Sequence, residues 1–293
     1  MDAERASWRS EALGPARRIE LDAGTIRAYV TGDGPPIVFV HGLLVNANLW
    51  RGVAPRLDGC RSVALDLPLG SHLESMPRKA DLSPPRLADM VADAIEGLEL
   101  DDVTVVGNDT GGALTQILAA RRPERIARVV LTSCDAFDNF PPRFFRVVLA
   151  PARVPGVIPV AFAGLRVRAL RRLPIAYGLL TNGAIDPRAD DSYVLPVVTR
   201  GEIRRDLRRV LAGLEARHTL DAAVRLADFR KPVMIAWSRD DRFFPGEHAE
   251  RLAKLFRDSR LEWIEGARTF SPEDRPERLA ELIGSFVRPP AAA

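Results

Sequence analysis

One stretch near the middle of the chain, residues 103–120, constrains the fold more than any other. It reads VTVVGNDTGGALTQILAA. Its opening β-branched run is typical of a strand, and the part after Gly111 has apolar residues at helical spacing. Asp109 lies midway between Gly107 and Gly111, and glycines at these positions permit a turn that is too sharp for larger residues. The stretch therefore predicts a strand, a tight turn that carries Asp109, and a helix.

The chain alternates strands and helices on both sides of this stretch. The unbroken apolar run at 37–40 is typical of a strand covered on both faces of a parallel sheet. The predicted strands are 18–21, 25–31, 37–40, 62–65, 103–106, 128–133, 233–237 and 261–264. The predicted helices are one through Trp50 and Leu57, one with Ser83 as its N-cap, one after Gly111, and two at 247–256 and 276–286. This order predicts a doubly wound, mostly parallel α/β sheet.

Residues 134–220 interrupt the alternation. They are rich in proline and contain the Arg-rich amphipathic pieces GLRVRALRRL and GEIRRDLRRVLAGL, without a convincing strand pattern. We predict a helical cap inserted into a core domain formed by residues 1–133 and 221–293. A basic face for membrane or partner contact is the alternative interpretation, but the arginines alternate with apolar residues as on an ordinary solvated helix.

Composition excludes several classes of protein. A chain of 293 residues with 46% hydrophobic and 28% charged residues can bury a substantial core and is not disordered throughout. The net charge is only +3, and no basic run is interleaved with aromatic residues, so we expect no nucleic-acid partner. Cys60 and Cys134 make neither a disulfide framework nor a metal-ligand spacing. With no phosphate loop or dinucleotide fingerprint, we expect no cofactor and no metal.

The N-terminal segment lacks the apolar core of a signal peptide, and no apolar stretch approaches the ~20 residues that span a bilayer. We therefore expect a cytoplasmic protein without a membrane partner, either a monomer or a homodimer, that acts on a small organic molecule.

Four landmarks in order resemble the α/β-hydrolase fold family. They are His41-Gly42 after an early strand, the central GNDTGG, the strand and helix order, and the acidic turn SRDDRFFP after a late strand. The resemblance covers essentially the whole chain, with residues 134–220 in the position of the family's cap. GNDTGG is most similar to the branch with an Asp nucleophile, which includes haloalkane dehalogenases and epoxide hydrolases. The resemblance implies that Asp109 lies at the nucleophile elbow.

A carboxylate in that position favours particular substrates. Attack on an sp³ carbon gives an alkyl ester that a His-activated water hydrolyses, whereas attack on an acyl carbon would give a labile anhydride. Asp109 therefore favours halides or epoxides over esters. The alternative is that Asp109 merely caps the following helix.

The resemblance also assigns partners to Asp109. The backbone amides of Leu43 and Thr110 would line the oxyanion pocket. Asp241, in the acidic turn, falls where the family keeps the acid that orients its base. Some members place this acid after the strand that follows the elbow helix, where Asp135 or Asp138 could serve.

The expected base is missing. The late segment EGARTFSPEDRPERLAELI resembles the family's terminal motif, but Thr269 stands where the family has its catalytic His. Threonine cannot accept a proton near neutral pH. Among the four histidines, His72 is the best substitute base because it lies in a loop on the carboxyl side of the sheet, where α/β active sites form. A loop-ordering role for His72 is the alternative.

The halide site also departs from the pattern. Dehalogenases of this family bind the halide with a Trp directly after the nucleophile, and here that residue is Thr110. They usually add an Asn after the His-Gly turn, and here that residue is Leu43, although Asn46 and Asn108 are close in sequence. Epoxide hydrolases instead use cap tyrosines to protonate the ring oxygen.

Tyr177 and Tyr193 lie in the predicted cap and could perform that protonation or simply pack. The sequence thus predicts an enzyme of the hydrolase class, dehalogenase-like or epoxide-hydrolase-like, that acts on a small, largely apolar substrate between sheet and cap. Because Thr269 replaces the His, two alternatives stay open: a lyase or cyclase that uses Asp109 as an acid-base group, and a ligand-binding pseudoenzyme without turnover.

Overall fold

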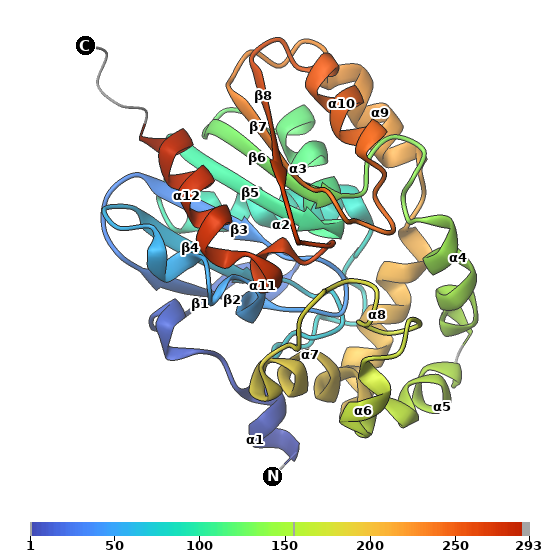
Figure 1. Ribbon diagram of the computed structural model, residues 1–293. Helices are drawn as coiled ribbons and strands as arrows, with labels where there is room; N and C mark the ends of the chain where they lie inside the picture. Colours follow the sequence, from blue (N-terminus) through green and yellow to red (C-terminus); the bar gives the residue numbers. More distant parts are fainter. Residues whose placement is uncertain (1, 155, 289–293) are drawn as a thin grey trace.

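An eight-stranded sheet forms the centre of the molecule (Figure 1). The computed structural model describes residues 2–154 and 156–288; Pro155 of the predicted cap and the PPAAA tail lie outside the described residues. The strand order is β1-β2-β4-β3-β5-β6-β7-β8. The pairs β1–β2 and β2–β4 are antiparallel, and all the other pairs are parallel. The predicted fold class, a mostly parallel α/β sheet, is confirmed.

The strands agree closely with the β-branched and apolar runs of the sequence. Their bounds are β1 Ala16–Leu21, β2 Gly24–Thr31, β3 Pro36–Val40, β4 Arg61–Asp66, β5 Val103–Asp109, β6 Ile126–Cys134, β7 Val233–Ser238 and β8 Ser259–Ile264. Every residue of β5 is buried, as expected for a central strand with helices on both faces. The central position of β5 places its carboxyl end, and hence Asp109, in the middle of the sheet edge.

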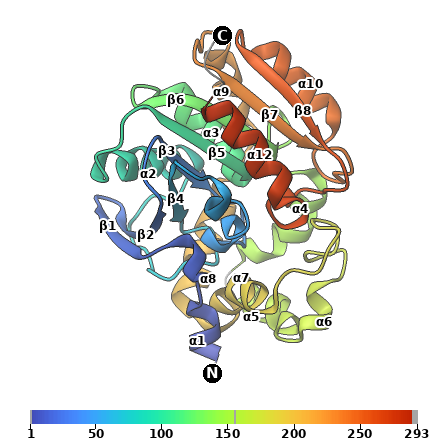
Figure 2. The same ribbon diagram turned by 60° about the vertical axis from the view of Figure 1, so that its left-hand side comes forward.

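Helices cover both faces of the sheet. They are α2 (Pro84–Gly97), α3 (Thr110–Arg121), α9 (Arg217–Leu226), α10 (Gly246–Leu255) and α12 (Pro276–Val287). The helix α3 packs against both α2 and α9. Figure 2 shows α12 crossing in front of the strands, on the face opposite α2 and α3. This arrangement holds β5 between two layers of helices.

Three local expectations were wrong or incomplete. The single helix predicted through Trp50 and Leu57 is instead two 3₁₀ turns, η2 (Ala47–Trp50) and η3 (Ala54–Arg56). Proline at 55 has no amide hydrogen and interrupts the helical ladder. The polar leader contains the helix α1 (Asp2–Ser7), which packs against the cap helix α7. A short helix, α11 (Ser271–Asp274), precedes α12 and was also not predicted.

The helices between β6 and α9 gather on one side of the molecule (Figure 1). They are α4 (Arg143–Leu149), α5 (Val157–Ala163), α6 (Arg168–Arg171), α7 (Pro187–Thr199) and α8 (Gly201–Gly213), with 3₁₀ turns η4 (Ala150–Arg153) and η5 (Gly164–Arg166). The predicted boundary at residue 220 falls inside α9. Because α9 packs on α3, it joins the layer that covers the sheet. Across the described ranges, no helix is both long and apolar enough to cross a membrane.

The turn between β5 and α3 depends on the close approach of β3. A Cβ at Gly111 would clash with the backbone carbonyl oxygens of Val40 and His41. Only a residue without a side chain lets α3 begin so near the end of β3, which is the physical reason for glycine at this position.

We predict that Gly111→Ala destabilises the protein by about 1–3 kcal/mol, because the backbone of β3 cannot move aside cheaply. A matched control is Gly284→Ala in α12, where the nearest atom to an added Cβ is 3.7 Å away. That change should stabilise the helix by up to about 1 kcal/mol. Urea denaturation measures both effects, and equal stability of the two variants would contradict this packing.

Candidate active site

Asp109 ends β5 in a strained backbone conformation. Its φ of 53° and ψ of −131° lie where residues other than glycine are rare. The amide of Leu43 donates a hydrogen bond of 3.1 Å to Asp109 Oδ2. A Cβ at Gly42 would clash with the same carboxyl group, so glycine there admits it. The Asp109 side chain makes no N-cap hydrogen bond deeper in α3.

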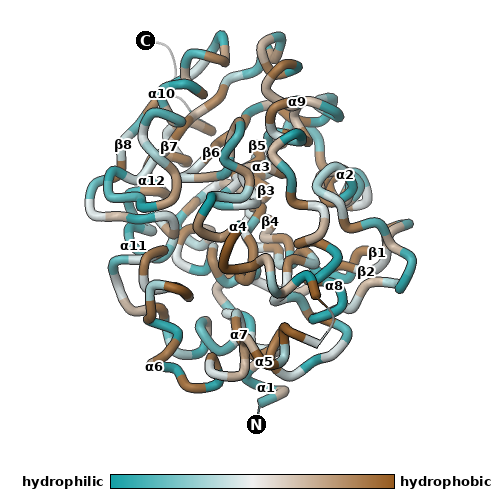
Figure 3. The backbone as a smooth tube through the Cα atoms, turned by 90° about the vertical axis from the view of Figure 1, so that its right-hand side faces the viewer, coloured by the Kyte–Doolittle hydropathy of each residue, from teal (hydrophilic) through white to brown (hydrophobic). Residues whose placement is uncertain are grey.

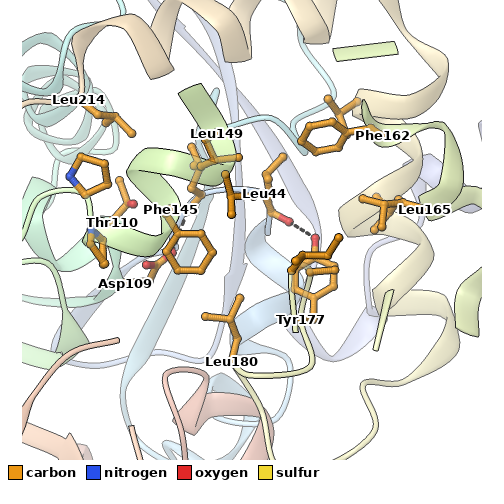
Figure 4. Close-up of a pocket in the computed structure, with 18 of the residues that line it drawn as sticks. Leu44, Asp109, Thr110, Phe145, Leu149, Phe162, Leu165, Tyr177, Leu180 and Leu214 are labelled. Atoms are coloured by element: carbon orange, nitrogen blue, oxygen red, sulfur yellow. Dashed lines mark hydrogen bonds between the residues drawn. The ribbon is translucent and has the colours of Figure 1, made fainter. Parts of the chain in front are cut away.

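The carboxyl group faces a largely apolar cavity of about 160 Å³ (Figure 4). Its polar lining consists of Asp109, Thr110, Asp135 and Tyr177. The apolar lining comes from the loop after β3 and from the cap, and includes Leu43, Leu44, Phe145, Leu149, Phe162, Leu165, Leu180, Val194, Val197 and Leu214. The sequence singled out none of these cap residues. The cavity can hold a small apolar molecule with its polar end near Asp109.

A second carboxyl group, that of Asp135, lies on the same cavity wall. Asp135 follows β6, the strand beside β5. Thr110 Oγ1 donates a hydrogen bond of 3.3 Å to Asp135 Oδ2, while Oδ1 is buried without a partner. Asp138 instead lies at the surface, 4.0 Å from Arg251. Of the two alternative acids named from sequence, the structure brings Asp135 to the cavity and leaves Asp138 outside it.

Burial dominates the acid-base properties of this pair. It raises the pKa of Asp109 to about 7, against the opposing effect of the Thr110 and Leu43 amides. Burial, with the nearby charge of Asp109, raises the pKa of Asp135 well above its usual value. Each carboxyl group of the pair therefore keeps its proton to a higher pH than an exposed aspartate does.

Asp241 and Thr269 are in direct contact. Thr269 Oγ1 donates a 3.1 Å hydrogen bond to Asp241 Oδ1, which also accepts from the amides of Phe243 and Phe244. Burial raises the pKa of Asp241 as well. Asn108 Nδ2 holds the Thr269 carbonyl at 2.7 Å. The predicted acid and the residue in place of the base thus lie together, but the pair offers a hydroxyl where an imidazole was expected.

The structure does not bring His72 to Asp109. Its Nε2 lies 3.4 Å from Asp206 Oδ2 in α8, and its Nδ1 accepts from the amide of Gly70 at 3.3 Å. His72 is buried and is not part of the cavity lining. His72 therefore connects its loop to α8, as the loop-ordering alternative predicted. Its position gives no support to a role as the base.

His41 is similarly occupied by the backbone. Its Nδ1 contacts the Gly42 carbonyl at 2.8 Å, and its Nε2 accepts from the amide of Leu67 at 2.9 Å. Burial lowers the pKa of His41 to about 4, so the ring stays neutral. His218 and His248 lie on α9 and α10, away from the cavity lining.

The two cap tyrosines have different surroundings. Tyr177 lines the cavity, and its hydroxyl donates to the Leu44 carbonyl at 2.6 Å (Figure 4). Tyr193 lies outside the lining, and its hydroxyl donates to Glu273 Oε1 at 2.8 Å. Tyr193 therefore lies away from the cavity with its hydroxyl bonded elsewhere, and the hydroxyl of Tyr177 already has an acceptor.

The side-chain amides of Asn46 and Asn108 are bonded to partners away from Asp109. Asn46 Nδ2 donates to the Ser192 carbonyl at 2.9 Å, and Asn108 bonds Thr132 and Thr269. Neither asparagine lines the cavity. No group of three or more His, Cys, Asp or Glu side chains within residues 2–154 and 156–288 could hold a metal ion.

Comparison with known proteins shows which proteins this chain is similar to. Residues 35–157 match the α/β hydrolase fold family. The chain is 28% identical over 271 residues to haloalkane dehalogenase 2 of Mycobacterium tuberculosis, covering 92% of this chain and 93% of that protein. It is 27% identical over 285 residues to the uncharacterized hydrolase YugF of Bacillus subtilis, covering 95% and 100%.

The solved structure of haloalkane dehalogenase DbeA from Bradyrhizobium elkani superposes with a TM-score of 0.77 at 21% identity, covering 93% of this chain and 97% of that one. The chain has the α/β-hydrolase fold, and it is related to proteins that are named hydrolases.

We predict that Asp109→Asn stabilises the protein at pH 8 but not at pH 4. A carboxyl pKa raised from 3.8 to about 7 means that the folded state resists ionisation, so the stability of the native protein falls as pH rises between these values. The full pKa shift corresponds to at most about 4 kcal/mol of unfolding free energy. We expect Asp109→Asn to raise the free energy of unfolding at pH 8 by about 1–3 kcal/mol, measured by urea denaturation. An equal effect at both pH values would contradict the raised pKa.

Proposed function

We propose that this protein is an enzyme that acts on small, largely apolar organic molecules, with Asp109 as the reacting carboxyl group. The observation that carries the proposal is the pair of buried carboxyl groups, Asp109 and Asp135, on one wall of an apolar cavity. Ionisable groups with strongly shifted pKa values in a cavity are typical of catalytic sites. The relatives named as hydrolases support an enzyme over a binding protein.

Proton transfer is the chemistry that suits this pair best. Near neutral pH the ionised Asp109 would remove a proton from the substrate, while the protonated Asp135 would donate one at a second atom. The substrate then gains and loses one proton, as in a lyase or cyclase step, and needs no water. This route requires no imidazole, and the histidines of the described ranges are bonded elsewhere or lie outside the cavity lining.

Hydrolysis through a covalent ester is the second candidate. The Leu43 amide holds one oxygen of Asp109, which leaves the other available to attack an sp³ carbon. The C–O bond of an alkyl ester would form as the carbon–halogen bond breaks and halide leaves, or as the epoxide C–O bond breaks and its oxygen takes a proton from water. Hydrolysis of the ester would then release an alcohol, or a diol from an epoxide, and restore the Asp109 carboxylate. The dehalogenase relatives favour this route. Two observations disfavour this route. The Tyr177 hydroxyl already donates to the Leu44 carbonyl, and neither Asn46 nor Asn108 lines the cavity.

We predict that activity rises with pH through about 7, because Asp109 must be ionised in either route. In the proton-transfer route activity falls again at higher pH as Asp135 ionises. In the hydrolytic route activity instead stays constant at higher pH. If the proton-transfer route operates, Asp135→Asn should lower kcat by about 10²–10⁴-fold, as expected for loss of a general acid. A pH–rate profile that is flat between pH 5 and 9 would contradict both routes.

Isotopes distinguish the two routes directly. Small apolar ketones incubated in D₂O should take up deuterium at the α-carbon if Asp109 transfers protons, and Asp109→Asn should abolish the exchange. Bromoalkanes and terminal epoxides in H₂¹⁸O should give ¹⁸O-labelled alcohol over many turnovers, or an ester on Asp109 visible by intact-protein mass, if the route is hydrolytic. A result with neither exchange, label nor adduct would overturn the proposed function.

A further inference from the structure

Between residues 139 and 185 of the cap, every charged side chain is positive. This segment contains seven arginines and neither aspartate nor glutamate. Arg171 is buried and pairs with Asp190 and Asp191, but the other six arginines are exposed. Of these six, only Arg168 forms a salt bridge with a carboxylate in the part of the chain that the structure describes. The remaining ones are Arg143, Arg146, Arg153, Arg166 and Arg172. The cap therefore presents unpaired positive charge to its surroundings.

The same segment exposes apolar side chains. Helix α4, with the sequence RFFRVVL, has no buried residue at all. Figure 3 shows the hydrophobic colour along α4 and α5 on this face. The exposed large apolar residues of the segment are Val147, Val148, Val154, Val160, Val167, Leu170, Leu173 and Ile175. We call these eight residues and the five unpaired arginines the cap face. An apolar group of this extent, set among positive charges, is typical of an interaction surface.

The cavity reaches the cap face. Val148 and Ile175 are exposed at the surface and also line the cavity that holds Asp109. Phe145 on α4 and Ala161 on α5 line it as well. A molecule that leaves the cavity past these side chains would therefore arrive among the apolar residues of the cap face.

We propose that the cap face docks on the surface of an anionic lipid bilayer. The short helices α4, α5 and α6 would lie in the plane of the interface, with the valines and leucines among the acyl chains and the arginines at the phosphate level. A second copy of the chain is disfavoured because a twofold interface would place the same unpaired arginines against one another. Docking needs no spanning helix.

This surface departs from the expectation of no membrane partner. The amphipathic pattern of arginine and apolar residues in the cap is compatible both with a helix that packs on a core and with a helix that faces a bilayer. The structure distinguishes them within α4, since Phe145 and Leu149 pack toward the core while Val147 and Val148 are exposed. Membrane docking is a property separate from the proposed reaction. It can be tested without any measurement of enzymatic activity.

Vesicle flotation of the full chain tests the proposal. We expect binding to vesicles of phosphatidylglycerol and phosphatidylcholine, weak binding to phosphatidylcholine alone, and weakening by salt. The double variant Val147→Asp/Val160→Asp, at side chains 74% and 78% exposed, should bind at least about tenfold more weakly. Replacing Arg143 and Arg166 by Gln should weaken binding by about fivefold for each arginine.

The matched control is Val224→Asp on α9, at a residue 76% exposed and outside the cap face, and it should bind within about twofold of the parent. Thermal melting checks that all variants remain folded. Equal binding to both vesicle types, no binding to either, or an equal loss in the Val224 control would overturn the proposal. A dimer in light scattering that Val160→Asp dissociates, without vesicle binding, would assign the surface to a second copy instead.

Discussion

The site depends on one interaction, the hydrogen bond from the Leu43 amide to the Asp109 carboxyl group. Asp109 accepts this bond with a backbone φ of 53°, which residues other than glycine rarely adopt, and glycine at 42 makes room for the carboxyl group. The surrounding sheet supplies the rigidity, because β5 is buried along its whole length between β3 and β6. A strained residue of this kind persists only where its surroundings hold it firmly. The fold therefore keeps a carboxyl group in a place where water is scarce.

Removal from water gives the carboxyl group its chemical character. Burial raises the pKa values of Asp109, Asp135 and Asp241 together, and the Thr269 hydroxyl that contacts Asp241 supplies no second base. A carboxyl group that ionises near pH 7 can both accept and donate a proton under ordinary conditions. Cap residues supply most of the apolar lining of the cavity that Asp109 and Asp135 share. The proposed chemistry and the proposed docking surface would both suit a lipophilic substrate.

Local patterns were enough to predict the sheet and the turn at Asp109. The strand β3 is a continuous apolar run, and β5 opens with β-branched residues. Glycine is needed at 107 and 111 because a Cβ there would clash with nearby backbone atoms. Partners distant in the sequence could not be predicted in this way. His72 bonds Asp206 and Tyr193 bonds Glu273, and no local pattern reveals either pair. The apolar cavity lining was missed for the same reason, since periodicity shows that a cap residue is apolar but not which surface it faces.

The central claim is that Asp109 titrates near neutral pH, and ¹³C NMR of the aspartate carboxyl carbons measures this directly. The Asp109 signal is identified by its loss in Asp109→Asn. The predicted result is an apparent pKa of about 7 for Asp109, together with a pKa of Asp135 well above its usual value. Titration of Asp109 at or below about 4, the value of an ordinary exposed aspartate, would contradict the account.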